Sequence, residues 1–248
     1  MQASVDPDGY FDERWAATYD ESTAAMSTPD AVGPVVGFLA ALAEGGRALE
    51  LGIGTGRIGV PLARCGVPVH GIELSQAMAA RISRKPGGES IGVTIGDFAT
   101  ATVDETFSLA YLVFNTIMNL TSQDAQVACF ANVSAHLQPS GFFVIEVVVP
   151  GLQRLAPGQV IQDFHISEES WGLDEYDVVN QGLKSHSFRF VDGEVRHKAV
   201  PFRYVWPAEL DLMAKIADMD LYERWADWER EPFTAESRQH ISVWQKKG

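Results

Sequence analysis

The chain has 248 residues, of which 46% are apolar, and its 33 acidic and 19 basic residues give a formal net charge of −14. This length and composition allow one domain with a sizeable buried core. The negative charge argues against a nucleic-acid substrate, since nucleic-acid-binding proteins usually carry a clustered basic face. The N-terminal stretch is acidic and polar, and the longest apolar run, near residues 142–150, is interrupted by Glu146. We therefore expect no membrane partner and a cytoplasmic location.

Strand-like and helix-like segments alternate along the first 150 residues. Helices are expected over residues 10–25, 31–43, 58–66, 75–85 and 121–137. Strands are expected over residues 48–52, 67–74, 91–96, 107–115 and 141–150. Ser75 and either Thr121 or Ser122 are suited to cap helices. This alternation predicts a parallel sheet covered by helices on both faces.

The pattern changes after Pro150. Residues 151–205 alternate apolar and polar side chains, and Asp192-Gly193 predicts a tight hairpin turn. A helix over 207–219 and two strands over 221–230 and 240–247 complete the chain. No repeat or low-complexity linker separates these segments, so we expect a single domain over residues 1–248. Its parts are N-terminal helices (1–45), a cofactor-binding core (46–150), an inserted antiparallel cap (151–205), and a C-terminal helix with a strand pair (206–248).

The stretch ALELGIGTGRIG, residues 48–59, fits two glycine patterns. Gly52, Gly54 and Gly56 give G-x-G-x-G, whereas Gly54, Gly56 and Gly59 give the dinucleotide fingerprint G-x-G-x-x-G. A glycine turn between a strand and a helix lets a ligand approach the backbone, and the helix N-terminus favours anions. Both patterns share these properties, so the glycines alone do not identify the ligand.

Acidic residues near the strand ends favour a cationic adenosine ligand. A fixed negative charge on Glu50, at the carboxyl end of the first strand, would oppose a pyrophosphate and attract an ammonium or sulfonium group. Glu73, at the end of the second strand, can accept both hydroxyls of a ribose. Asp97 and Phe98 follow the third strand and suit the amino group and the face of an adenine ring.

With these motifs the chain resembles the class I S-adenosylmethionine-dependent methyltransferases. The resemblance rests on E-L-G-I-G-T-G-R at 50–57, Glu73 followed by L-S-Q-A-M, the pair Asp97-Phe98, and Val113-Phe114-Asn115. It implies an α/β, Rossmann-like seven-stranded sheet of order 3-2-1-4-5-7-6 with the last strand antiparallel. An antiparallel β cap after strand five looks like that of bacterial small-molecule methyltransferases, including those that N-methylate amino sugars.

The resemblance also implies S-adenosylmethionine as the cofactor. Glu50 and the glycines would line its methionine moiety, Glu73 would bind the ribose, and Met78 would pack on adenine, while Asp97 and Phe98 hold the edge and face of that ring. Tyr19, in the pattern A-x-x-Y-D, resembles a tyrosine that reaches the cofactor carboxylate, with docking of its helix on the core as the alternative role. The expected cofactor-binding residues are Tyr19, Glu50, Gly52, Gly54, Gly56, Arg57, Glu73, Leu74, Met78, Asp97, Phe98 and Asn115.

The expected reaction is in-line transfer of a methyl group to a nitrogen or oxygen atom of a small organic acceptor. Such a displacement needs positioning and no general acid, but a hydroxyl acceptor needs a base. The candidates for that base are His165 and His186 in the cap and Glu146 in strand five. A surface or hydrogen-bonded role for the histidines, and a structural role for Glu146 toward a helix or the pocket wall, stay open.

Other features narrow the acceptor. The sequence N-T-I-M-N-L after strand four lacks the D-P-P-Y signature, which argues against N-methylation of DNA bases. Cys65 and Cys129 lack metal-site or disulfide spacing, and we expect no metal. The aromatic residues Tyr10, Phe11 and Trp15 of the N-terminal helix either close the pocket or, above all for Trp15, dock the helix on the core. Acidic cap residues either attract an aminated acceptor or form a solvated charge run. These are Glu168, Glu169, Asp174, Glu175 and Asp177.

Two other functions stay open at this point. The first is a nicotinamide-dependent (NAD or NADP) oxidoreductase, a hypothesis that only the glycines at 54, 56 and 59 support. A non-catalytic S-adenosylmethionine-binding protein is the second. The oligomeric state is open too, with a homodimer as one option.

Overall fold

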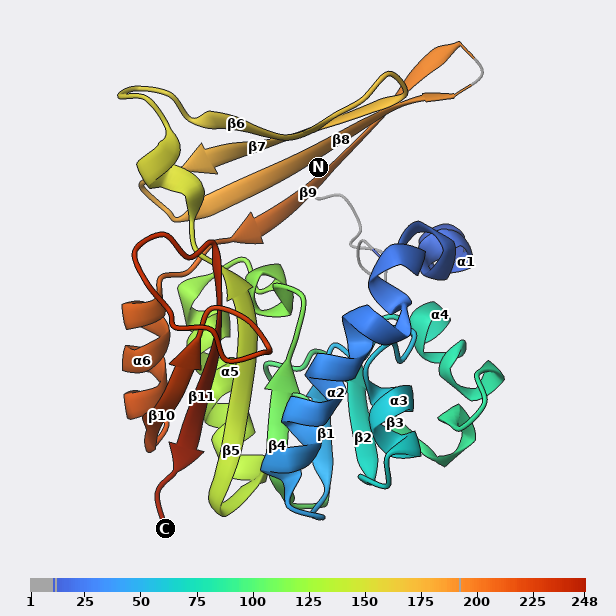
Figure 1. Ribbon diagram of the computed structural model, residues 1–248, viewed down its shortest axis with the longest axis vertical. Coiled ribbons are helices and arrows are strands. Elements are labelled where there is room, and N and C mark those ends of the chain that lie inside the picture. The colour runs from blue at the N-terminus through green and yellow to red at the C-terminus, as the bar shows by residue number, and fades with distance from the viewer. Residues whose placement is uncertain (1–10, 12, 192) are drawn as a thin grey trace, which may run out of the picture.

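The computed structural model describes residues 11, 13–191 and 193–248. A twisted seven-stranded sheet forms the core, and a four-stranded antiparallel sheet lies beyond one end of it (Figure 1). The core strands are β1 (Ala48–Leu51), β2 (Val69–Glu73), β3 (Gly92–Ile95), β4 (Phe107–Leu112), β5 (Leu137–Val148), β10 (Met219–Trp225) and β11 (Gln239–Lys246).

The order of the core sheet is β3-β2-β1-β4-β5-β11-β10. Strands β1 to β5 run parallel to one another, and β11 is antiparallel to both β5 and β10. The predicted order 3-2-1-4-5-7-6 with an antiparallel last strand is therefore confirmed.

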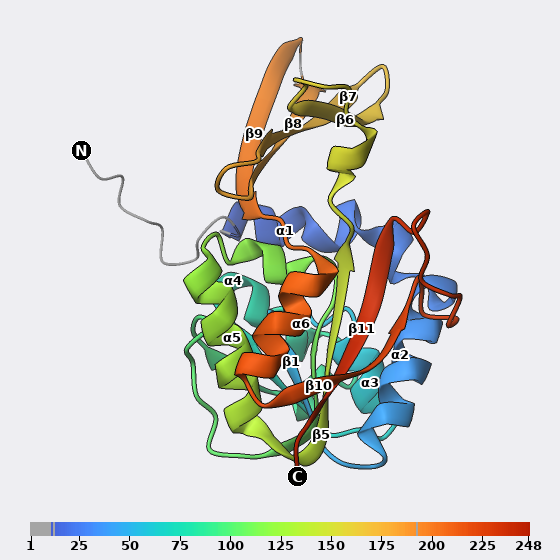
Figure 2. The ribbon, with the colours of Figure 1, turned by 90° about the vertical axis from the view of Figure 1, so that its left-hand side faces the viewer.

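Helices cover both faces of this sheet. Figure 2 shows α2 and α3 on one side, with α5 and α6 on the other. Ser75 and Ser122 cap α4 and α5 as predicted, since their hydroxyls accept from the backbone N–H groups three residues later. The α-helices are α1 (Glu13–Ser22), α2 (Pro29–Ala43), α3 (Gly59–Arg64), α4 (Gln76–Ala79), α5 (Gln123–His136) and α6 (Pro207–Ile216). The 3-10 turns are η1 (Ala24–Ser27), η2 (Ile82–Arg84), η3 (Gly88–Ser90), η4 (Thr116–Asn119) and η5 (Gly151–Arg154).

One predicted helix is wrong as a continuous element. Residues 75–85 form only the single turn of α4, followed by the 3-10 turn η2. Lys85 is extended, with ψ 137°, because it precedes Pro86, whose ring disfavours helical backbone at the residue before it. The helix predicted over 10–25 is α1 in the described residues, and its predicted start at Tyr10 lies outside them.

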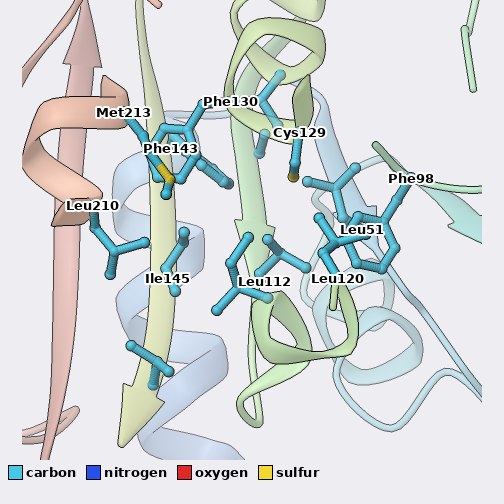
Figure 3. Packing of buried hydrophobic residues seen from close by; sticks show 14 of the residues in the cluster. Leu51, Phe98, Leu112, Leu120, Cys129, Phe130, Phe143, Ile145, Leu210 and Met213 are labelled. Atoms are coloured by element: carbon cyan, nitrogen blue, oxygen red, sulfur yellow. The ribbon is translucent and has the colours of Figure 1, made fainter. Parts of the chain in front are cut away.

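Alternate residues of β4 pack on opposite faces of the sheet. Ala110 and Leu112 join the cluster under α5 and α6, whereas Leu109 and Tyr111 join the cluster under α2 and α3. Figure 3 shows the first cluster, in which Phe130 of α5 lies edge-on to Phe143 of β5 at 5.0 Å between ring centroids. Two-sided burial explains why the central strands read as nearly continuous apolar runs.

The cap sheet consists of β6 (Ile161–Ile166), β7 (Ser170–Asp177), β8 (Gly182–Val191) and β9 (Glu194–Arg203), each antiparallel to the next. This confirms the antiparallel insertion after strand five; Asp192 of the predicted turn lies outside the described residues. At the base of the cap, the buried Arg203 pairs with Glu209 at 2.7 Å and donates to Gln126. The cap is thereby joined to α5 and α6. In the described part of the chain, no helix is long and apolar enough to cross a membrane.

Candidate active site

Three adjoining cavities are lined by residues at the carboxyl ends of the core strands and by α1, and one of them also by the cap. The inner cavity, about 40 Å³, lies beside the glycine loop and contains Glu50 and Arg57 in its wall. The rim cavity, about 130 Å³, extends toward the end of β2. The cap cavity, about 460 Å³, opens between the core and the cap. Tyr19 and Thr116 line all three, so the cavities adjoin at these two residues, and together they are called the groove below.

The glycine loop requires its glycines for backbone reasons. Gly52, Gly54 and Gly56 have φ values of 66°, 59° and 80°, which L side chains rarely adopt. A Cβ atom at Gly52 would also lie 2.7 Å from Cγ2 of Thr116. The loop therefore brings bare backbone to the floor of the groove, as the sequence predicts.

Glu50 is buried beneath this loop, with 3% of its surface exposed. Burial raises its pKa to about 8, although the hydroxyl of Tyr111, the charge of Arg57 and the N–H of Gly59 all favour the ionised form. Tyr111 donates to Oε2 at 3.0 Å. Glu50 is thus a buried carboxyl at a cavity wall that would gain from a bound cation.

This finding corrects one part of the sequence argument. The fixed negative charge expected at Glu50 is wrong for the ligand-free chain, because a carboxyl with a pKa of about 8 is mostly protonated at pH 7. A preference for a cation would not need a fixed charge, since an ammonium or sulfonium group beside Glu50 would favour its ionisation, whereas a pyrophosphate would oppose it further.

Glu73 lies at the edge of the rim cavity with both carboxylate oxygens in fixed positions. Oε2 accepts from the N–H of Gly54 at 2.8 Å, and Oε1 accepts from the N–H of Ser75 at 2.9 Å. Each oxygen keeps further acceptor capacity. The carboxylate therefore joins the glycine loop to the end of β2 at the edge of the rim cavity.

Apolar side chains form much of the rest of the rim cavity. Leu74, Met78 and Phe98 line it together with Phe11 and Asn119. Asp97 does not line it: this exposed side chain accepts from the N–H of Ala99 at 2.8 Å. The structure brings the aromatic member of the Asp97-Phe98 pair into the groove and leaves the carboxylate at the adjacent loop.

A strained turn after β4 forms the junction between the cavities. Phe114 and Asn115 have φ values of 63° and 60°, which are costly for residues other than glycine. The carboxylate of Glu146 accepts from the N–H of Phe114 at 2.9 Å, and Oδ1 of Asn115 accepts from the N–H of Val148 at 2.7 Å. The guanidinium of Arg57 lies 3.6 Å from the centroid of the Phe114 ring.

Glu146, a candidate base in the sequence, faces away from the cap cavity. It holds the Phe114 turn and also accepts from Nε1 of Trp228 at 3.2 Å. Its carboxylate lines a fourth space of about 280 Å³, the side cavity, together with Arg57 and Phe114. The structure thus gives Glu146 a positioning contact instead of access to the large cavity.

The two candidate histidines are also absent from the described lining of the cap cavity. His186 follows Ser185, which does line the cavity, and strand alternation turns it to the other side. There it stacks on His197 and lies 3.3 Å from Glu175. His165 is exposed, with Nε2 3.0 Å from the hydroxyl of Ser170.

Several groove residues were missed by the sequence reasoning. Thr116 and Asn119 belong to η4, whose position depends on the unexpected turn at residues 114–115. The cap residues that line the cavity come from all four cap strands. Asp174 is one of the acidic cap residues named from the sequence, whereas Leu183 and Ser185 were missed, although the two-residue period of β8 places them on one face of the strand. The cap residues of the lining are Phe164, Asp174, Leu183, Ser185 and Phe202.

The N-terminal aromatic residues divide between two roles. Phe11 and Tyr19 line the groove. Trp15 instead meets the cap, where Nζ of Lys198 lies 3.4 Å from the centroid of its indole ring. Helix α1 therefore contacts both the core and the cap, and Figure 2 shows it lying between them.

Comparisons with known proteins agree with this geometry. Residues 48–141 match a family model described as a methyltransferase domain. The solved structure of the CcbJ methyltransferase from Streptomyces caelestis is 36% identical, covers 94% of this chain and 96% of its own, and superposes with a TM-score of 0.83. The chain belongs to the S-adenosylmethionine-dependent methyltransferases. The oxidoreductase alternative is therefore not retained.

Two further relatives of this methyltransferase are informative. The cypemycin N-terminal methyltransferase of a Streptomyces species is 26% identical over 211 residues, which cover 82% of this chain and 84% of that protein. The structure of CalS10, an amino pentose methyltransferase from Micromonospora echinaspora, has a TM-score of 0.70 at 19% identity and covers 93% of this chain and 97% of its own. The CalS10 structure contains bound S-adenosylmethionine.

The groove of this methyltransferase fits its cofactor in chemical type. S-adenosylmethionine carries a ribose diol, a flat aromatic base and two positive charges. The described groove offers a carboxylate with fixed orientation at Glu73, apolar walls at Met78 and Phe98, and the buried carboxyl of Glu50. These groups match the parts of the cofactor in kind.

Proposed function

We propose that this methyltransferase transfers the methyl group of S-adenosylmethionine to a nitrogen or oxygen atom of a small organic acceptor held in the cap cavity. The connection of the three cavities at Tyr19 and Thr116 carries the proposal, because a ligand that fills the inner and rim cavities would end at the opening of the cap cavity. The reaction would be an in-line displacement.

The cofactor-binding roles follow from this arrangement. Glu73 would accept the ribose hydroxyls, while Leu74, Met78 and Phe98 would enclose the adenine. The glycines at 52, 54 and 56 would bring the backbone close to the ligand. Other members of the proposed set are Tyr19, Glu50 and Arg57 around the amino-acid moiety and Asn115 beside the methyl group. Asp97 does not line the rim cavity and would have to reach the adenine edge from the adjacent loop.

S-adenosylmethionine supplies a methyl group on a positively charged sulfur, which leaves as a neutral thioether. The residues of the chain need to hold the acceptor atom in line with that methyl group and to exclude water. Positioning of this kind can contribute several kcal/mol, on the order of 7 or more for well-oriented groups. The Phe114-Asn115 turn, fixed by Glu146 and Val148, is placed to provide this rigidity.

A nitrogen acceptor is favoured over oxygen by two observations. The cypemycin relative is named for methylation of an N-terminus, and CalS10 is named for an amino pentose. Neither predicted histidine base lines the cap cavity, and a neutral amine attacks without a general base.

The proposal is tested by incubating the protein with S-adenosylmethionine and a panel of amines, phenols and carboxylates. Formation of S-adenosylhomocysteine together with a methylated amine is the expected result. If the cofactor binds in calorimetry but no acceptor is methylated, the non-catalytic alternative replaces this proposal.

A further inference from the structure

The cap cavity has an uneven distribution of chemical groups. Its described lining includes one acidic side chain, Asp174, and no Lys, Arg or His. The remaining polar lining groups are hydroxyls and amides. The lining residues are Phe11, Tyr19, Phe114, Asn115, Thr116, Met118, Asn119, Val148, Phe164, Asp174, Leu183, Ser185 and Phe202.

Asp174 is held in this cavity by the cap sheet. It lies on β7, opposite Gln162 of β6 and Ser185 of β8, and it is half-buried. Burial raises its pKa, while a hydrogen bond from Ser185 and the charge of His186 favour the ionised form. Asp174 forms no ion pair with a described residue, and the charge of His186, which pairs with Glu175, acts on it without direct contact.

Aromatic rings surround the same space. Five of the lining residues are aromatic: Phe11, Tyr19, Phe114, Phe164 and Phe202. The faces of such rings attract cations, and the attraction grows as water is excluded. Because a carboxylate and aromatic rings in one cavity both favour a positive charge, the cavity is unsuited to an anionic ligand.

We propose that Asp174 binds a positively charged amine of the methyl acceptor and so makes the enzyme select amines over alcohols, phenols and acids. Where this amine is also the nitrogen that is methylated, it releases its proton to solvent before the transfer, and the neutral amine then attacks the methyl carbon. This inference rests on the proposed function, which places the acceptor in the cap cavity. Asp174 is a specificity-determining residue in this account, and it contacts the acceptor directly. Glu175, the next residue on β7, is exposed and pairs with His186, so it offers a control carboxylate of equal charge.

Benzylamine and benzyl alcohol test the inference, because they have nearly the same shape and differ in charge. Each is titrated into the complex with S-adenosylhomocysteine, with binding followed by NMR. The wild type is expected to bind benzylamine about tenfold more tightly or better, as one charge-assisted hydrogen bond implies. Asp174→Asn should abolish this preference, and Glu175→Gln should retain it.

Three results would overturn the inference: no binding of benzylamine to the wild type, equal affinity for both compounds, or a preference that survives in Asp174→Asn. The affinity for S-adenosylhomocysteine, measured by calorimetry, should be equal in all three proteins and reports on their folding. If Asp174→Asn does not fold, a crystal of the wild-type complex soaked with benzylamine decides, since the ammonium group must then contact Asp174.

These outcomes separate the inference from the proposed function. If benzylamine binds at Asp174 but no compound in the acceptor panel is methylated, the amine site stands and the proposed function fails. If an amine is methylated with the same KM by the wild type and by Asp174→Asn, the proposed function stands and the role of Asp174 fails. A higher KM in Asp174→Asn with kcat unchanged supports both.

Discussion

Replacing Glu50 with Gln should remove a pH dependence of stability from the ligand-free protein. The pKa of Glu50 rises from 4.5 to about 8 on burial. Because the folded-state pKa is the higher one, the stabilising contribution of the protonated carboxyl is complete below pH 4.5 and is lost as the pH rises to about 8. At about 1.4 kcal/mol for each tenfold change in proton affinity, the loss amounts to at most about 5 kcal/mol.

The assay is urea unfolding of the wild type and Glu50→Gln between pH 4.5 and 8.5. The variant should gain stability relative to the wild type as the pH rises, whereas Glu236→Gln, at an exposed loop position, should follow the wild type throughout. A stability difference between Glu50→Gln and the wild type that does not vary with pH would refute this account of the buried carboxyl.

Cofactor binding should reverse part of this effect. A cation beside Glu50 favours its ionised form, so binding of S-adenosylmethionine should release protons near pH 7. Calorimetry in two buffers of different ionisation enthalpy measures this release. Equal apparent enthalpies in the two buffers would mean that no protons are released and would contradict this prediction. Proton release that persists in Glu50→Gln would show that another group is responsible.

Three further predictions follow from the groove and the core. Glu73→Gln replaces one carboxylate oxygen with an NH₂ group, which cannot accept from the backbone N–H that faces it, so the substitution should weaken binding of S-adenosylmethionine about tenfold. Unchanged affinity in calorimetry would contradict the role of Glu73. Gly52→Ala should lose cofactor binding and about 1–3 kcal/mol of stability, because its Cβ would meet Thr116 at 2.7 Å; wild-type affinity and melting temperature would count against this. Phe143→Ala should lower the free energy of unfolding by about 3–5 kcal/mol, and a loss below 1 kcal/mol in urea unfolding would contradict its place in the core.

The sequence alone was sufficient to predict the strands and turns that depend on a local pattern of residues. Burial on both faces of the sheet gives β4 and β5 long apolar runs in the sequence. The G-x-G-x-G turn predicts the end of β1, because few residues other than glycine adopt its backbone angles. The sequence also carries signals against a long helix over residues 75–85, because Pro86 and two glycines follow directly after it. The apolar pattern of residues 75–85 nevertheless predicts one helix, whereas α4 ends at Ala79.

The acceptor side of the site was harder to predict. Its residues come from η4, β6, β7, β8 and β9, which are far apart in the sequence and meet only through the folding of the cap over the core. Whether Ser185 or His186 faces the cavity depends on which side of β8 is turned inward, and the alternating pattern is nearly symmetric there. The buried state of Glu50 likewise depends on Tyr111, which lies 61 residues away in sequence.

The central claim is that the groove directs the methyl group into the cap cavity. A crystal structure of the complex with S-adenosylmethionine tests it most directly. The account predicts a methyl carbon that faces the cap cavity between Phe114 and Asp174, with the ribose on Glu73. A methyl carbon that faces the side cavity beside Trp228, or bulk solvent, would contradict it.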